Sequence, residues 1–596
     1  MTKQDVLKKY FGFDSFRSIQ EEAIDKILNK ESLLVVLPTG SGKSLIYQLP
    51  SIMMSGVTVV ISPLIALMQD QVANLNANGI TAKMISSQNS FEENNQVFEE
   101  LQQNRLKFLY VAPERFTNDF FLSQLKKLNI NFFVIDEAHC VSEWGHEFRA
   151  DYRKLSLLRD IFQYTPIATF TATATKSVQE DIVKTLKIPQ TNILKTSMNR
   201  TNLFIRVQRR VGDGKKQIKA FLDTHKDECG IVYCFTRKEC ENLSHYLNQN
   251  GYDTLAYHAG LSSDKRDGIF KKFKSEEVKV IVATIAFGMG IDKANIRFVL
   301  HTSMPKTLEN YSQEIGRAGR DGLNSDVLLL FSKADEIAKQ RFIDELPDGV
   351  YKDSAYQKLQ NIYKFCISEK CRHKLLAKYF NDDIEPCKTL CDNCTETKKE
   401  QTDITVEAQK FLSAVYRTDE RFGQTHIVDI LKGSKAKRIL DFGHDRLSVY
   451  GIGSEFSKEQ WSVVTDKLLD IDAIMIDGEY RVLKLTSIAK KILKKELNVK
   501  IDSKLLEKQK VFKEYKKDDT KSKYFEDFRT LRLEIAQKDG VPPYIVFSDK
   551  TLNLIAQNLP TTDKEFLDIN GVGEMKLERY GEIFMKLAIK IKKTVL

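Results

Sequence analysis

The sequence lacks the features that mark secreted and membrane-embedded proteins. Residues Met1–Lys9 include no apolar core of a signal peptide. No stretch approaches the roughly 18 uninterrupted apolar residues that a membrane span needs. Nine cysteines among 596 residues are too sparse for a disulfide scaffold, and five of them are scattered. We therefore expect a cytoplasmic protein in which the four cysteines between Cys371 and Cys394 form one metal site.

Neither basic nor acidic residues are in strong excess. Lys and Arg total 91 against 81 Asp and Glu, so the formal net charge is +10. This balance permits a polyanionic partner without demanding one, because a few basic stripes are enough locally. The chain is too long for one hydrophobic core, and its length predicts about four domains.

Short apolar runs alternate with longer polar, helix-like stretches up to about residue 340. This alternation is typical of a parallel sheet wrapped by helices, and it restarts after about Asn202. The runs are Leu33–Leu37, Val57–Ile61, Phe108–Val111, Phe132–Ile135, Ile167–Phe170, Ile231–Phe235, Thr254–Tyr257, Val278–Ala283, Phe298–His301 and Val327–Phe331. The sequence therefore predicts an α/β protein with two tandem parallel-sheet lobes, followed by helical, Lys-rich segments.

The first run leads into a phosphate loop. Leu33–Ser44 is a buried-type strand, a Gly-rich turn and the start of a helix, in which glycines let backbone N–H groups curl around phosphate oxygens. Lys43 would reach the β and γ oxygens, and the Ser44 hydroxyl would ligate Mg²⁺. Leu37 replaces the first glycine of the standard pattern, so a chance turn is the alternative. The predicted ATP-binding residues are Thr39, Gly40, Ser41, Gly42, Lys43 and Ser44.

A pair of acidic residues supports the same site. Asp136 and Glu137 follow the apolar strand Phe132–Ile135, at the end where open α/β sheets bind ligands. Asp136 would hold Mg²⁺ through its water shell, and Glu137 would polarise the attacking water. The alternative is that Asp136 and Glu137 are solvated acids at a strand end. This alternative does not explain why the pair lies one sheet-length after a phosphate loop.

Two arginines in the second lobe complete the predicted ATP site. Arg317 and Arg320 lie in the segment Gln313–Gly322, and we expect them on one face of a helix. An arginine that reaches across a cleft to the γ-phosphate neutralises transition-state charge and is worth roughly 10³–10⁵ in rate. Arg320 is our first candidate for this finger and Arg317 the second. A surface basic helix is the alternative for this segment alone.

These segments resemble the motifs of superfamily 2 helicases. Further segments share the resemblance, namely Ser62–Leu64, Ala112–Glu114, Thr171–Thr175, Tyr257–Gly260 and Ala283–Asp292. Two others narrow the resemblance to the RecQ family of DNA helicases. The first is Phe11–Gln20, which is similar to the family's adenine-reading motif. It implies that Gln20 hydrogen-bonds to the adenine edge while Phe13, often Tyr in the family, stacks on the base and Arg17 supports it.

The second segment is Ser142–Arg149, which resembles the aromatic-rich loop of RecQ helicases. Stacking of bases on aromatic side chains is worth about 1–3 kcal/mol per base and is indifferent to sequence. A loop so close in the chain to Glu137 can report DNA occupancy to the ATP site. A buried structural tryptophan is the alternative for Trp144. The predicted DNA-coupling residues are Trp144, His146, Phe148 and Arg149.

The clustered cysteines predict a structural zinc site. Cys371, Cys387, Cys391 and Cys394 supply four soft ligands for a tetrahedral Zn²⁺. Cys366 or His373 could replace Cys371, and an iron–sulfur cluster is a further alternative. Three residues separate Cys387 from Cys391, whereas RecQ proteins usually have two in this gap. The difference bears on the shape of the loop and not on the number of ligands.

The resemblance also implies RecA-like lobes and two accessory DNA-binding domains, a winged helix and a helical HRDC domain. The implied division is 1–202 and 203–340 for the lobes, 341–402 for the zinc-binding region, 403–515 for the winged helix and 520–596 for HRDC. We expect Thr395–Asp403 to be a polar linker and Thr562 and Glu565 to form a capping box. Exposed basic residues would contact duplex DNA, namely Lys435, Lys437, Arg438 and Arg446.

The activity that the resemblance implies is ATP-dependent, 3′→5′ unwinding of duplex or branched DNA in recombination and repair. ATP, Mg²⁺ and Zn²⁺ would be its cofactors, and single-stranded and duplex DNA its partners, with a single-stranded-DNA-binding protein as a further partner at the nucleoid. An RNA helicase is one rival, because those families share the Asp-Glu-Ala-His box. A DNA-binding scaffold with a fossil motor is another, which the intact Lys43, Glu137, Arg317 and Arg320 argue against.

Overall fold

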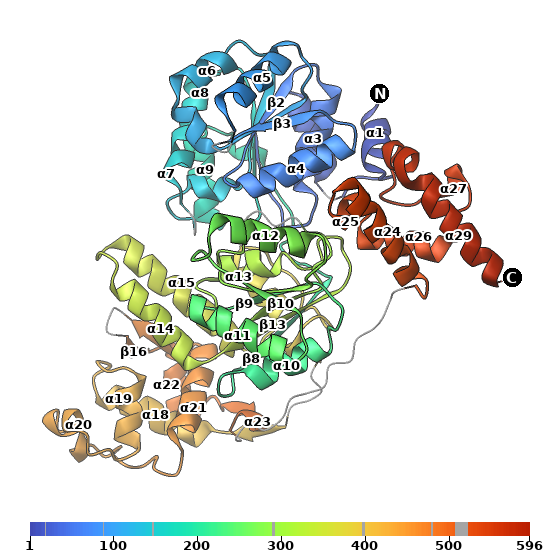
Figure 1. Cartoon of the computed structure of the whole chain (residues 1–596). Helices are drawn as coiled ribbons and strands as arrows, with labels where there is room; N and C mark the ends of the chain where they lie inside the picture. The colour runs from blue at the N-terminus through green and yellow to red at the C-terminus, as the bar shows by residue number, and fades with distance from the viewer. Residues whose placement is uncertain are drawn as a thin grey trace.

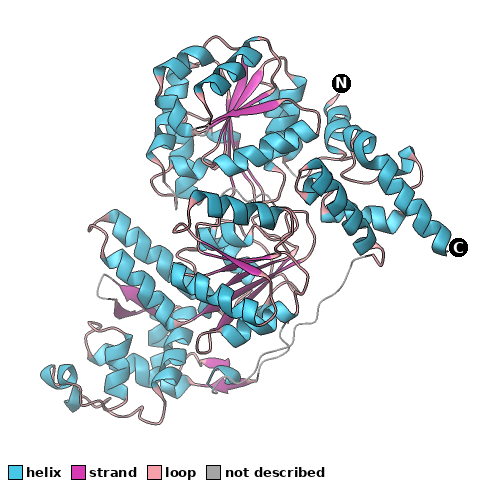
Figure 2. Cartoon of the chain, in the orientation of Figure 1, coloured by secondary structure: helices cyan, strands magenta, loops and turns pink. Residues whose placement is uncertain are grey.

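A computed structural model shows two stacked α/β lobes, with the modules before residue 507 packed on the second lobe and the C-terminal helical module next to α1 (Figure 1). It describes residues 1–17, 19–86, 89–145, 148–288, 293–395, 400–477, 481–506 and 522–595. Each lobe is a central sheet with helices on both faces (Figure 2). Within these described ranges, no helix is both long and apolar enough to cross a membrane.

The first lobe contains a seven-stranded parallel sheet with the order β3-β4-β2-β5-β6-β1-β7. Its central strands are buried throughout because helices cover both faces. The strands are β1 Leu33–Val36, β2 Val57–Ile61, β3 Ala82–Ile85, β4 Phe108–Val111, β5 Ile130–Ile135, β6 Ile167–Thr171 and β7 Ile193–Lys195. The α-helices are α1 Lys3–Val6, α2 Gln20–Leu28, α3 Lys43–Met53, α4 Ile65–Ala77, α5 Phe91–Gln102, α6 Asp119–Leu125, α7 Ala150–Arg153, α8 Leu158–Ile161 and α9 Lys176–Thr185.

The second lobe repeats this plan with six parallel strands in the order β10-β11-β9-β12-β13-β8. The two parallel sheets confirm the predicted α/β architecture. The strands are β8 Leu203–Arg209, β9 Gly230–Tyr233, β10 Thr254–Tyr257, β11 Val280–Ala283, β12 Phe298–His301 and β13 Ser325–Phe331. The helices are α10 Lys215–Asp223, α11 Arg237–Gln249, α12 Ser263–Lys274 and α13 Leu308–Ile315.

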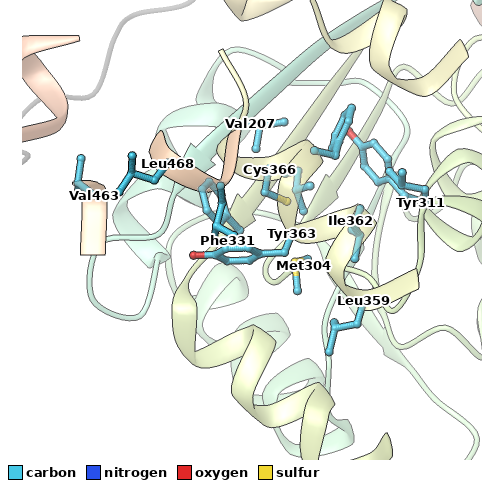
Figure 3. Close-up of a cluster of buried hydrophobic side chains, with 14 of the residues drawn as sticks. Val207, Met304, Tyr311, Phe331, Leu359, Ile362, Tyr363, Cys366, Val463 and Leu468 are labelled. Carbon is cyan, nitrogen blue, oxygen red and sulfur yellow. The ribbon is translucent and has the colours of Figure 1, made fainter. Parts of the chain in front are cut away.

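A helical region packs directly on the second lobe. Leu359, Ile362 and Cys366 of its longest helix lie against side chains of the lobe, including Tyr311 of α13 and Phe331 of β13 (Figure 3). This packing makes one continuous hydrophobic core from the second lobe to the modules that follow it. The helices are α14 Lys333–Asp344, α15 Val350–Ile367, α16 Arg372–Tyr379 and α17 Asp392–Thr395.

In its described residues, the next module combines six helices with two antiparallel pairs of strands, one of them a β-hairpin. Residues 401–403, expected within a polar linker, instead form β14, which pairs antiparallel with β17. The expected linker was wrong there because pairing with a distant strand satisfies the backbone of this polar segment. The elements are β14 Gln401–Asp403, α18 Thr405–Arg417, α19 Gln424–Leu431, α20 Lys437–Asp441, α21 Lys458–Asp470, β15 Ile474–Asp477, β16 Val482–Leu485, α22 Ser487–Leu493, β17 Lys500–Asp502 and α23 Ser503–Leu506.

The C-terminal module is all helical, and one of its expected caps forms only in part. Thr562 accepts a hydrogen bond from Glu565 N (3.3 Å), but the Glu565 carboxylate accepts from Thr561 N (2.7 Å) and not from Thr562 N. The reciprocal half of the expected capping box is therefore wrong by one residue. The helices are α24 Phe525–Asp539, α25 Pro543–Val546, α26 Asp549–Asn558, α27 Asp563–Leu567, α28 Glu574–Lys576 and α29 Glu582–Val595.

This C-terminal module lies beside both lobes, next to α1 (Figure 1). On the first lobe, Gly571 N donates to the Gly12 carbonyl (2.9 Å). On the second, the buried Glu276 carboxylate pairs with Arg529 (3.2 Å) and with Lys293 of its own lobe (3.4 Å). Although burial opposes ionisation, the charges of Lys293, Arg532 and Arg529 hold the pKa of Glu276 well below its usual range. One helical module thus contacts the adenine-motif segment and the second lobe together.

Candidate functional site

The phosphate loop connects β1 to α3 at the edge of the first lobe that faces the second. Gly40 and Gly42 adopt φ values of +82° and +79°, which favour glycine. A side chain at Gly40 would begin 3.2 Å from the Cα of Arg320, and one at Gly316 would begin 3.1 Å from Thr39 Cβ. Glycines on both sides therefore let the lobes meet at the loop.

Gln20, the first residue of α2, lies against the same loop. Its side-chain amide donates to the carbonyls of Ser41 (3.2 Å) and Gly42 (3.3 Å), and its side-chain oxygen accepts from Arg17 N (2.8 Å). Gln20 is buried, Phe13 is half-buried and Arg17 is exposed. The adenine-motif glutamine is thus brought to the phosphate loop, and pairing with a base would require it to exchange the two bonds to loop carbonyls.

The acidic pair follows β5 at the carboxyl edge of the sheet. Glu137 has a φ of +49°, a left-handed conformation that costs a non-glycine residue about 1–3 kcal/mol. Its carboxylate lies 3.4 Å from His139 Nδ1, and the same ring nitrogen lies 3.0 Å from Thr171 Oγ1 at the end of β6. Because β6 is the strand between β5 and β1, these contacts connect the acidic pair to the sheet beside the phosphate loop.

Asp136 has an unusual environment for a carboxylate. Burial and the adjacent Glu137 charge raise the pKa of Asp136 to about 6, while the Lys43 charge acts in the opposite direction. Lys43 and Asp136 are therefore close enough to interact. The oxygen ligands offered here by Asp136 and the Ser44 hydroxyl are the type that Mg²⁺ prefers, so these residues fit that ion.

The expected helix for the two arginines is wrong. Helix α13 ends at Ile315, and Arg317 and Arg320 lie in the turns that follow it. Gly319 has a φ of +59°, and a side chain there would begin 2.4 Å from Asn202 Nδ2, so the close approach of Asn202 requires a glycine turn. The turn separates the arginines, because Arg317 is buried beside Tyr233 whereas Arg320 faces the phosphate loop.

Arg200, which the sequence reasoning missed, joins the two sides of this cleft. Its guanidinium donates to the carbonyl of Thr39 in the phosphate loop. It also donates to the carbonyls of Ala318 (3.0 Å) and Gly319 (2.9 Å) in the arginine-bearing turn. Burial and the nearby Arg320 charge lower the pKa of Arg200 to about 10. No motif marks Arg200, because its partners are backbone carbonyls whose positions only the fold defines.

The aromatic-rich loop presents its rings to solvent. The exposed fractions are 50% for Trp144 and 43% for Phe148, so the alternative of a buried Trp144 is wrong. The tryptophan that packs in a core is Trp461, in α21. Arg149, the last residue of the loop, donates to the Pro63 carbonyl (3.4 Å) in another helicase-like segment. His146 lies outside the described residues.

The four clustered cysteines form one site. Their sulfur atoms all lie within 4.8 Å of one another, and those of Cys387 and Cys391 are 3.5 Å apart. Tetrahedral zinc with Zn–S bonds of about 2.3 Å would place its sulfur ligands about 3.8 Å apart, so the site fits zinc. His373 is bonded to the Leu203 and Leu390 carbonyls (3.2 and 3.1 Å), and Cys366 is buried in the adjoining core. Neither alternative ligand belongs to the cluster.

The cysteine site is attached to the edge strand of the second lobe. Ile205 N of β8 donates to the Leu390 carbonyl (3.0 Å), and Val207 N donates to the Asp392 carboxylate (2.8 Å). Asp392 also accepts from Arg372 Nε (3.1 Å) at the start of α16. The loop that carries Cys391 therefore runs alongside β8 and joins the helical region to the second lobe.

Replacing Cys391 with serine is expected to remove the bound zinc and lower the melting temperature by roughly 10 °C, because metal binding free energy contributes to folding. Zinc content per chain and calorimetry measure both effects. Cys366→Ala is the matched control and should keep its zinc. Full zinc content in Cys391→Ser would contradict the ligand assignment.

The basic residues expected to contact duplex DNA lie on the surface around α20. This region also has two exposed apolar side chains, Leu440 and Phe442. The Arg438 guanidinium lies 5.7 Å from the centre of the Phe422 ring. The exposed basic residues are Lys435, Lys437, Arg438 and Arg446.

A phosphate loop in one α/β lobe that faces Arg320 of a second defines a two-lobed, nucleotide-driven motor of helicase type. Family models match five successive segments of the chain. They are the DEAD/DEAH box helicase (17–182), the helicase conserved C-terminal domain (214–322), the RecQ zinc-binding region (333–395), the RQC domain (398–510) and the HRDC domain (522–587).

Curated relatives match along the whole chain. The ATP-dependent DNA helicase RecQ of Pasteurella multocida is 39% identical over 605 residues, which cover 100% of this chain and 94% of the relative. The protein of the same name from Bacillus subtilis is 40% identical over 588 residues, which cover 98% of each. The chain belongs to the RecQ family.

Proposed function

We propose that this chain is an ATP-dependent DNA helicase that translocates 3′→5′ on single-stranded DNA and unwinds duplex or branched DNA in recombination and repair. The observation that carries the proposal is the contact between the lobes, where Arg320 of the second approaches Gly40 of the first. Full-length relatives named as DNA helicases support DNA as the polymer. The polarity rests on membership of the RecQ family.

ATP hydrolysis would use groups from both lobes. The backbone of Thr39 to Ser44 would cradle the phosphates, with the Lys43 ammonium on the β and γ oxygens. Mg²⁺, held by Ser44 and Asp136, would neutralise charge on the phosphate oxygens. The left-handed turn at Glu137 and its contact with His139 support a fixed carboxylate that orients the attacking water.

Closure of the lobes would bring the Arg320 guanidinium onto the γ-phosphate. Arg317 lies deeper, beside Tyr233, so it would support the turn and the local positive potential. Arg200 would keep that turn against the loop. Loss of the γ-phosphate would remove the anion that attracts Lys43 and Arg320 from opposite lobes, so the cleft would open and translocation would follow.

Adenine recognition would involve the segment around Gln20. Gln20 would exchange its bonds to the Ser41 and Gly42 carbonyls for bonds to the adenine edge. Binding of the base would thereby be coupled to the conformation of the phosphate loop. Phe13 would stack on the base and Arg17 would support it. The C-terminal module contacts Gly12, next to Phe13, so its docking would influence this pocket.

DNA would be sensed by Trp144, His146, Phe148 and Arg149. Exposed rings at Trp144 and Phe148 support a stacking surface for bases. Arg149 joins this loop to the Pro63 segment, and the loop begins shortly after Glu137. If DNA displaces the loop, the position of the nearby hydrolytic residue Glu137 would therefore change as well.

Trp144→Ala is expected to lower the DNA-stimulated rate of ATP hydrolysis roughly ten-fold, because one stacking contact is worth about 1–3 kcal/mol, while ATP binding is retained. Steady-state phosphate release with and without single-stranded DNA measures this. Acrylamide quenching of tryptophan fluorescence checks separately that DNA reaches the loop of the parent protein. Bound DNA should reduce quenching of the exposed Trp144, whereas the buried Trp461 is protected with or without DNA. Equal stimulation in parent and variant would exclude the coupling role.

The accessory modules would hold the duplex ahead of the motor. Exposed basic side chains around α20 suit sequence-independent backbone contacts. The proposed division is 1–202 and 203–340 for the lobes, 341–402 for the zinc-binding region, 403–515 for the winged helix and 520–596 for HRDC. A single-stranded-DNA-binding protein is a proposed partner, and the cytoplasmic nucleoid is the proposed place of action.

Strand displacement from tailed duplexes tests the proposed function. The full chain with ATP and Mg²⁺ is expected to unwind a DNA duplex with a 3′ single-stranded tail and to fail on one with a 5′ tail. The same duplex in RNA serves as the polymer control. Unwinding of only the RNA substrate, or no ATP-dependent unwinding at all, would refute the proposal.

A further inference from the structure

The ammonium group of Lys358 connects three parts of the chain. Lys358 lies on α15, in the helical region after the second lobe. It donates to the Trp144 carbonyl in the aromatic-rich loop of the first lobe (3.1 Å) and lies 3.5 Å from the Glu309 carboxylate in the first turn of α13. One cation therefore contacts both the proposed DNA-sensing loop and the helix that precedes the arginines.

Glu309 needs a cation where it lies. Its side chain is 5% exposed, and a buried carboxylate is costly unless it is paired. Tyr379 of α16 is close to the same group, since burial and the Glu309 charge raise the pKa of Tyr379. Within the described part of the chain, Lys358 is the cation for which an ion pair with Glu309 is observed.

Helix α13 can carry a displacement from Glu309 to the arginine turn. Its eight residues span about 12 Å at 1.5 Å per residue, and Gly316, Arg317 and Arg320 follow directly. Helix α13 packs tightly on α15, because the rings of Tyr311 and Phe365 are 5.4 Å apart and both side chains are buried. Helix α13 therefore moves as a rigid element, so a displacement of its first turn also displaces its last.

The other end of the connection is a loop with a reason to move. Trp144 presents an exposed ring, and a base that stacks on it would change the position of the Trp144 backbone as well. Lys358 holds that backbone carbonyl directly. Its four-carbon stem lets the ammonium follow a small movement, but the ammonium cannot keep both contacts when loop and helix separate.

We propose that Lys358 is a positioning residue for ATP hydrolysis: it makes the placement of Arg320 depend on the aromatic-rich loop through Glu309. The inference rests on the proposed function, because it assumes that DNA sets the position of the loop. The role of Lys358 is to join the loop to α13, with no contact to the nucleotide.

Lys358→Met tests the inference, because methionine keeps an unbranched apolar stem and removes the ammonium. The DNA-stimulated kcat for ATP hydrolysis is expected to fall about ten-fold, while the DNA-free rate and the DNA concentration for half-maximal stimulation stay within about two-fold. Lys358→Arg should restore most of the stimulation, because a guanidinium can reach both oxygens. Lys364→Met, on the same helix but paired with Asp472 (2.9 Å), is the matched control and should match the parent.

The outcomes separate this inference from the proposed function. Normal stimulation in Lys358→Met, alongside impaired stimulation in Trp144→Ala, would overturn the role of Lys358 and leave the helicase proposal standing. A raised half-saturating DNA concentration with unchanged kcat would also overturn it, because Lys358 would then be a DNA contact. A parent protein whose ATP hydrolysis ignores DNA would instead refute the proposed function. Thermal melting of each variant checks that the fold is retained.

Discussion

Glu137→Gln is expected to lower the DNA-stimulated rate of ATP hydrolysis by about 10²–10⁴-fold, the usual contribution of a positioned general base. Glutamine has nearly the same shape, so the left-handed turn at this position and the neighbouring His139 should stay in place. The amide, however, cannot accept the proton of the attacking water. Phosphate release under saturating ATP and DNA measures the loss.

Nucleotide binding should survive the same substitution, because the phosphate loop and Lys43 are unchanged. A fluorescent ATP analogue titrated in equilibrium measures this. Glu180→Gln, an exposed glutamate on α9 of the same lobe, is the matched control and should hydrolyse ATP like the parent. Hydrolysis by Glu137→Gln at the parent rate with DNA present would show that the catalytic assignment is wrong.

Arg320→Ala is expected to have the largest effect on kcat, a loss of about 10³–10⁵-fold, because an arginine finger neutralises charge that develops on the transferred phosphoryl group. Arg320→Lys should recover little, because an ammonium cannot form the paired hydrogen bonds of a guanidinium. Steady-state hydrolysis measures kcat, and single-turnover hydrolysis measures the rate of phosphoryl transfer. Binding of ADP should be unaffected, since ADP has no γ-phosphate.

The alternative finger is tested with the same assay. Arg317 is buried beside Tyr233, so Arg317→Ala is expected to loosen the turn and to lower thermal stability as well as the rate. Arg341→Ala removes an exposed arginine from α14 and controls for the loss of one positive charge. Retained activity in Arg320→Ala with loss only in Arg317→Ala would transfer the finger role to Arg317.

The central strands of both lobes could be predicted because they are buried on two faces and form continuous apolar runs. The predicted runs at Val57–Ile61 and Phe298–His301 coincide with β2 and β12. Strand β8 was missed because it is an edge strand with alternating burial, in which polar residues interrupt the run. The opposite edge strand, β10, was predicted because charged residues do not interrupt its run Thr254–Tyr257.

The parts of the candidate nucleotide site that depend on local order in the chain could be located from the sequence. The glycines of the phosphate loop and the acidic pair after β5 are of this kind. Arg200 and the turn of Arg317 and Arg320 are different, because carbonyls at Thr39 and Gly319 determine their places. The docking of the C-terminal module on Glu276 is likewise a contact between distant segments, in which each charge looks like a solvated surface residue in the sequence.

We propose that the γ-phosphate is held between Lys43 of one lobe and Arg320 of the other. The most direct measurement compares the affinity of ADP alone with that of ADP plus aluminium fluoride, which mimics the transferring phosphoryl group, in the parent, Lys43→Ala and Arg320→Ala. We predict that the parent prefers the fluoride complex and that Arg320→Ala loses this preference while it binds ADP normally. An undiminished preference in Arg320→Ala would contradict the account.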